Sequence, residues 1–383
     1  MPGKSLNLAV AIILPAVLLA AAYAQAQAPE PPAVSEESLR SGLTEREKRV
    51  VEAYIKYWTE VLAAAENEAV VLTARNALLD GCRKHSADPY QDAYADKSAQ
   101  IVTDIIRTPP AKLAKLKEVN VAMFFADSQM RRVATREAYA MMVVHANPAV
   151  RHLGWQAYRA ICSQVIALER PRAQLLALLR TAGGAEESPL VAEEIFRTLS
   201  APVSVIPMTE QKLAEVRKEL LEIFQFCWLA WCKRVLAGHA DAAEACQVGL
   251  GPLWNTAALM DRDQAVKTTV LQMTADILWC SSKAYQEARA AGATGRANAA
   301  LLLLAEKTLA ALTGVQQDTI AQAMSDTRLD LEEKGDEARR HALDWIDQLT
   351  ASGVNDPGDK FQPKPQPQPE PETQPATSTA PGS

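Results

Sequence analysis

The chain has 383 residues, of which 48% are hydrophobic and only 5% aromatic, and its formal net charge is -6. A chain of this length can bury a large hydrophobic core, in one domain or in two. Because the charge balance is acidic, the chain lacks the overall basic character of a nucleic-acid-binding protein, and no nucleic-acid partner is predicted.

The N-terminus has the pattern of a secretory signal peptide. Lys4 supplies a short positive region, residues 6–22 are almost entirely apolar, and small residues at alternate positions up to Ala28 offer several cleavage points. An uncleaved anchor is the alternative, but the run is short for a spanning helix and contains a proline. We therefore predict that residues 1–28 are removed. The mature protein is expected to be exported, periplasmic or secreted, without a transmembrane segment.

Helical periodicity dominates the rest of the chain, and no stretch shows the sustained alternation of a β-strand. A polar lead-in at residues 29–43 precedes a helical domain at residues 44–353, which opens with a capping box at Thr44 to Glu47. Gly183-Gly184 is expected to end a helix. The predicted helices begin at Thr44 and then cover residues 68–83, 88–107, 112–126, 127–144, 147–168, 171–181, 188–200, 209–236, 242–248, 252–260, 263–290, 296–313 and 316–350.

The C-terminal residues 354–383 are rich in proline, with alternating Gln-Pro and Lys-Pro pairs. Such a composition favours extended polyproline II structure and disfavours a packed fold. We predict a disordered tail, which could act as a spacer or as a peptide that docks on a partner.

A repeated helix start gives the best indication of architecture. Asn147-Pro148 opens a helix whose apolar Val150 is followed by Arg151, and Ser188-Pro189 repeats the cap and the proline. This pattern resembles HEAT-type helical repeats, mainly over residues 127–200. The resemblance implies an irregular α-solenoid of stacked helix pairs and a protein-binding role. An irregular helical bundle is the alternative fold.

Six cysteines remain after the predicted cleavage. In an oxidising compartment an even number permits disulfide bonds, and one or two bridges are as plausible as six buried core thiols.

No local motif for chemistry stands out. The chain lacks a Gly-x-Ser-x-Gly elbow, His-Glu-x-x-His, Cys-x-x-Cys and a glycine-rich phosphate loop. No catalytic residue, metal site or cofactor is therefore predicted, although carboxylates from distant helices could still converge.

Two groups of residues are candidates for partner binding. Arg131, Arg132 and Arg136 lie on a predicted helix after a lysine-containing one. They are either a solvated face or a docking site for an acidic partner or an anionic envelope polymer. Trp228 and Trp231 lie on an apolar helix that is either buried all round or the lining of a groove.

These observations favour an exported, non-catalytic helical scaffold that binds another protein in the cell envelope. A helical binding protein for a small apolar ligand is the second hypothesis. An α/α-fold enzyme acting on envelope carbohydrate is the third.

Overall fold

The computed structural model describes residues 28–200, 208–259, 264–288, 292–315 and 317–361. Within these ranges all regular structure is helical and no strand occurs, which confirms the predicted all-α class. Most of the predicted signal peptide and the tail beyond Phe361 lie outside the described residues. None of the described helices is long and apolar enough to cross a membrane.

The helices follow one another closely along the chain. The N-terminal half contains α2 (Glu36–Ser41), α3 (Glu45–Ala64), α4 (Glu68–Arg83), α5 (Asp88–Ile101), α6 (Thr103–Arg107), α7 (Ala114–Ala126), η1 (Ser128–Met130), η2 (Val133–Thr135), α8 (Arg136–Val143), α9 (Pro148–Ala167), α10 (Glu169–Ala185) and α11 (Pro189–Leu199). The C-terminal half contains α12 (Glu210–Leu236), α13 (Ala240–Leu259), α14 (Gln264–Glu287), α15 (Gly292–Thr313), α16 (Thr319–Ser325), α17 (Leu331–Ala351) and α18 (Pro357–Phe361).

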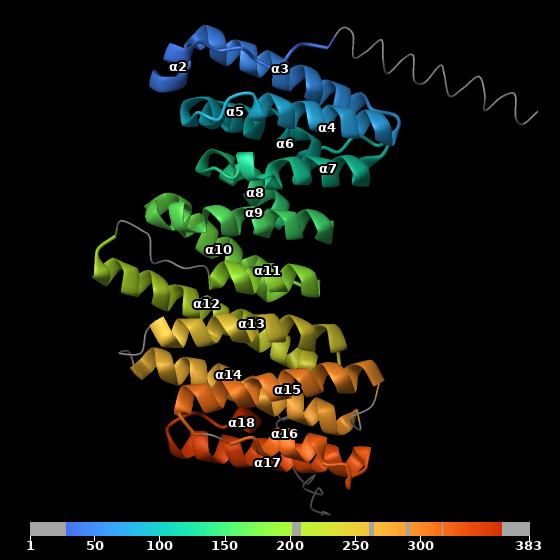
Figure 1. Cartoon of the computed structure of the whole chain (residues 1–383), viewed down its shortest axis with the longest axis vertical. Helices are drawn as coiled ribbons and strands as arrows, with labels where there is room; N and C mark the ends of the chain where they lie inside the picture. The colour runs from blue at the N-terminus through green and yellow to red at the C-terminus, as the bar shows by residue number, and fades with distance from the viewer. Residues whose placement is uncertain (1–27, 201–207, 260–263, 289–291, 316, 362–383) are drawn as a thin grey trace, which may run out of the picture.

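Figure 1 shows these helices stacked in chain order along the long axis of the molecule. Contacts between helices define two rows. The first row runs through α4, α7, α9, α11, α13 and α15, and the second row runs through α5, α6, α8, α10, α12, α14 and α17. Neighbours in the two rows also pack together, as α9 does with α10 and α14 with α15.

Helix starts with a local capping signal occur where the sequence predicts them. Thr44 and Glu47 form the expected capping box, in which each side chain binds the backbone N–H of the other residue. Asn147 caps α9 by accepting a hydrogen bond from the N–H of Ala149, with Pro148 in the first turn. Thr209 caps α12 by accepting one from Lys212.

Several predicted boundaries are wrong. The lead-in contains a short helix, α2, capped by Ser35. The helix predicted at residues 88–107 is divided at Val102 into α5 and α6. The one predicted at residues 316–350 is divided into α16 and α17, because Asp330 starts a new helix with its own capping box.

The glycine pair Gly183-Gly184 lies inside α10 and does not end it. A Cβ atom on Gly183 would lie 2.5 Å from the Cys227 sulfur, and one on Gly184 would lie 2.3 Å from the ring of Phe226. The two glycines therefore allow α10 and α12 to approach closely. Similarly, α13 continues through residues 249–251, where the sequence predicts a break, and α11 and α15 pack against it.

The most deeply buried helix is α14. All its residues from Val270 to Ser282 are buried, whereas α12 leaves Phe226 54% exposed. The prediction that the aromatic helix is buried all round is therefore wrong for one face of α12. On its buried face Trp228 donates a hydrogen bond from Nε1 to the carbonyl of Met273 in α14, at 2.8 Å.

The folded part of the chain continues to Phe361, beyond the predicted boundary at residue 353. The ring of Phe361 stacks on Trp279 at a centroid distance of 5.8 Å, and Lys360 forms an ion pair with the buried Asp276. These contacts hold α18 on α14. The sequence could not predict them, because α14 is distant from α18 along the chain.

All six cysteines are free and buried, so the structure contains none of the disulfide bonds considered above. Burial raises the pKa of the Cys82, Cys162 and Cys227 thiols to about 12, which leaves almost no thiolate at neutral pH.

We expect the native protein to react very slowly with a thiol reagent at neutral pH, because the thiols are buried and protonated. In guanidinium chloride without reductant, six thiols should react. Mass spectrometry after alkylation measures both numbers. A purified exported protein with four or fewer reactive thiols after denaturation would contradict the structure.

Candidate binding surface

An irregular segment between α7 and α8, residues 127–135, carries Arg131 and Arg132, and Arg136 is the first residue of α8. The sequence predicts one helix here, but the structure has two short 3-10 helices, η1 and η2. The buried hydroxyl of Thr135 donates to the carbonyl of Met130 at 2.9 Å, and Tyr139 donates to the same carbonyl at 2.6 Å. These side-chain bonds replace helical ones, so that the segment turns between the two rows.

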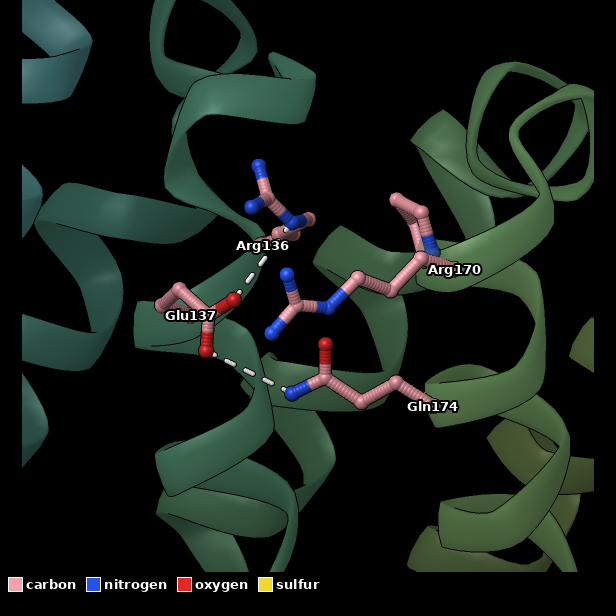
Figure 2. Close-up of a pocket in the computed structure, with 5 residues that line it drawn as sticks. Arg136, Glu137, Arg170 and Gln174 are labelled. Carbon is pink, nitrogen blue, oxygen red and sulfur yellow. Dashed lines mark hydrogen bonds and ion pairs between the residues drawn. The ribbon is translucent and has the colours of Figure 1, made fainter.

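The first concave site lies between α8 and α10 in the second row and has a volume of about 480 Å³. It is lined by Arg136 and Glu137 at the start of α8, and by Arg170, Pro171 and Gln174 in the first turns of α10. Figure 2 shows the guanidinium group of Arg170 extending from α10 toward Arg136 and Glu137. We call this site the arginine pocket.

Glu137 is the one carboxylate among the residues that line the arginine pocket. Its oxygens lie 3.4 Å from Nε of Arg136 and 3.4 Å from the amide nitrogen of Gln174, and both contacts are drawn in Figure 2. Contacts of this length are weak for charged partners, which normally approach to 2.7–2.9 Å. The side chain of Glu137 is 56% exposed, so it compensates little of the positive charge.

The second concave site is a groove of about 760 Å³ between α5 and the irregular segment. Asp88, Asp92 and Asp96 line one wall at four-residue spacing, and Arg131 and Arg132 line the other. The carbonyl of Val133, which also lines this groove, accepts a hydrogen bond from Arg136 at 3.3 Å. The groove therefore adjoins the arginine pocket on the second row.

Arg132 is occupied within the fold. It forms ion pairs with Asp92 at 2.8 Å and Asp88 at 2.9 Å. Burial disfavours its charge, but the hydrogen bonds to the two aspartates outweigh burial and raise its pKa above the usual value. Its main role in the structure is thus to join the irregular segment to α5.

The remaining predicted residues are separated. Arg131 donates from Nε to the carbonyl of Ala126 at 3.0 Å and lies in the groove, whereas Arg136 lies in the arginine pocket. The structure therefore divides the predicted basic group between two adjoining sites. Trp228 is fully buried and Trp231 is 2% exposed, and they line neither site.

Sequence reasoning missed Arg170 and Gln174. Both lie in the first turns of a predicted helix, and the start of α10 has no side-chain cap. The absence of a capping side chain at Leu168 indicates an open helix N-terminus. It does not indicate that Arg136, from a different helix, faces the same space.

No model of a known protein family matches this chain, and no curated protein is significantly similar to it.

Proposed function

We propose that this chain is an exported, non-catalytic helical scaffold that binds another protein in the cell envelope. We further propose that it is built as a HEAT-like α-solenoid. Export rests on the signal-peptide pattern of residues 1–28. The solenoid and the binding role rest on how the helices pack and on the surface that they present.

Packing between neighbours in the chain supports the solenoid. In solenoid proteins each repeat contacts only the adjacent repeats, and the stacked units form an extended surface. The two rows follow that rule, because the most extensive contacts join α-helices that are no more than three places apart along the chain. In the alternative bundle, helices far apart in the sequence would share one core.

One contact joins consecutive units where the repeat resemblance is strongest. Arg151 of α9 donates two hydrogen bonds to Glu186, both at 2.8 Å, and two more to the carbonyls of His145 and Ala146, both at 2.9 Å. Glu186 lies in the connection to α11, so this arginine links the starts of two successive first-row helices. Arg151, the basic residue of the repeated pattern, thus connects neighbouring helices.

The observation that carries the binding role is the pair of adjoining concave sites on the second row. Both contain charged groups from more than one element, and both are open to solvent. Protein interfaces use such charged, solvent-accessible concavities to select and orient a partner.

Site-specific photo-crosslinking in the cell envelope tests this proposal. A photoreactive residue at position 134, in the groove, should be captured by a protein partner in a defined ratio. The same residue at position 190, which is 63% exposed on the first row, is the matched control and should give no such product. Native mass spectrometry of the purified mature chain should show the same partner. Equal crosslinking from both positions, or a bound mass of a few hundred daltons without a protein, would contradict the proposal.

A further inference from the structure

The arginine pocket has the chemistry of an anion site. We propose that it binds a side-chain carboxylate from an acidic segment of the partner protein, held between Arg136 and Arg170. This proposal rests on the protein-binding function proposed above and specifies where and how the partner is recognised.

Arg170 is the first observation that supports the site. In the adjoining groove, Arg132 is paired with two aspartates, Asp88 and Asp92. Arg170 forms no ion pair or hydrogen bond within the described part of the chain, yet it extends into the pocket toward Arg136 (Figure 2). Both arginines line the same pocket. Two positive groups in one pocket repel each other, and an anion bound beside them would offset that repulsion.

The position of the pocket on α10 is the second observation. Arg170 and Pro171 belong to the first turn of α10, a helix of 17 residues whose N-cap, Leu168, provides no side-chain hydrogen bond. The N-terminus of such a helix carries partial positive charge from its unpaired N–H groups. Glu169 in the same turn offsets part of this charge but is exposed and does not line the pocket.

The shape and the other lining groups favour a protein carboxylate. A volume of about 480 Å³ accommodates a side chain and its adjoining backbone. Gln174 offers an amide and Pro171 an apolar wall, so the lining is mixed in polarity. Guanidinium groups bind carboxylates through paired hydrogen bonds. Glu137 contacts Arg136 and Gln174 at 3.4 Å, and because contacts of this length are weak, a ligand carboxylate can displace it toward solvent.

The test uses the folded mature chain and a fluorescein-labelled hexaglutamate peptide, with binding followed by fluorescence anisotropy at low ionic strength. Replacing Arg170→Gln should weaken binding about tenfold, because one charge-assisted hydrogen-bonding partner is lost. The matched control is Arg180→Gln, on the same helix, exposed and outside the pocket, which should change binding by less than about twofold.

A second variant is expected to act in the opposite direction. Glu137→Gln removes the competing carboxylate while keeping the shape of the side chain, so hexaglutamate should bind several-fold more tightly. A gain in binding cannot result from poor folding. Equal losses from the changes at Arg170 and Arg180 would overturn the proposal, since they would indicate general attraction by charge. Binding of inorganic phosphate, but not of hexaglutamate, would overturn the carboxylate assignment.

The anion site and the scaffold function can fail separately. If photo-crosslinking captures a partner equally well with the Arg170→Gln variant, the site is wrong and the scaffold function stands. If no protein partner is captured but hexaglutamate binding still depends on Arg170, the site stands and the scaffold function fails.

Discussion

Replacing Glu186 with alanine is expected to lower the free energy of unfolding by about 3–5 kcal/mol, because it leaves a paired arginine without its partner in the interior. The side chain of Glu186 is 2% exposed and that of Arg151 is 19% exposed. Hydrogen bonds to Glu186 also raise the pKa of Arg151 above its usual value. Because an arginine side chain is protonated at neutral pH even without a partner, Arg151 stays charged after the change and loses two of its four hydrogen bonds.

Glu186 also organises the start of α11. One of its oxygens accepts hydrogen bonds from the N–H groups of Glu187 and Ser188, at 2.9 and 2.8 Å. Ser188, the N-cap of α11, makes no side-chain capping bond itself. The carboxylate thus fills the capping role next to the helix N-terminus, where negative charge is favourable. Removing it should loosen the connection between α9 and α11 as well as the ion pair.

Urea or guanidinium denaturation followed by circular dichroism measures this loss. The adjacent Glu187→Ala variant is the control, since its side chain is 82% exposed and its contact with Arg234 is 3.6 Å long. The control should lose about 1 kcal/mol or less. If the two variants were equally stable, the bond between Arg151 and Glu186 would not join successive units of the stack.

The second large effect is expected where α18 docks on α14. Asp276 is fully buried, and Lys360 binds both of its carboxylate oxygens at 3.0 Å. Gln272 supports the same contact, because its amide donates to Asp276 at 2.9 Å and to the carbonyl of Asn355 at 3.0 Å. Burial raises the pKa of Asp276 above its ordinary value, although Lys360 and Gln272 act to lower it.

Replacing Lys360→Met should lower the free energy of unfolding by about 3 kcal/mol at neutral pH, because a buried carboxylate loses its cation. The loss should depend on pH. A carboxyl group whose pKa is higher in the folded than in the unfolded protein binds protons preferentially in the folded state. Its contribution to stability therefore falls as pH rises from the unfolded-state pKa to the folded-state pKa. Lys360 lowers the folded-state pKa of Asp276, so removing Lys360 raises this pKa further above the unfolded-state value. The difference between variant and wild type should therefore shrink as pH falls from neutral toward the ordinary pKa of aspartate.

The double variant Asp276→Asn with Lys360→Met provides the control. It has neither charge, and asparagine can still accept the hydrogen bond from Gln272, so most of the lost stability should return and its pH dependence should disappear. Denaturation curves for the three proteins across this pH range make the comparison. A loss in Lys360→Met that is independent of pH would show that Asp276 is not the group left unpaired.

The sequence by itself determined the helical class and many of the helix starts, because those signals are local. A cap such as Thr44 or Asn147 binds N–H groups two or three residues away, so its partners are known from the sequence. The same holds for the capping box at Asp330, which the sequence contains but which we did not use to divide residues 316–350.

At other places only the tertiary structure decided where helices are interrupted or continued. The segment at residues 127–135 departs from an α-helix because Thr135 and Tyr139 bind the buried carbonyl of Met130. The glycine pair at 183–184 remains helical because α12 packs against it. In each case the contacts that determine the backbone conformation are made with residues beyond the neighbouring turn of the chain. The free energy that stabilises this conformation comes from burial and hydrogen bonding between packed helices.

The candidate site shows the same division. The cluster at Arg131, Arg132 and Arg136 is visible in the sequence, but the structure separates its members. Arg132 forms ion pairs with Asp88 and Asp92, while Arg136 lines a pocket together with Arg170. Which carboxylate neutralises which arginine depends on distances between helices, since charges interact strongly only when they lie close together and away from water. The stacking of α8 on α10 therefore created the arginine pocket, and no spacing in the sequence could have predicted it.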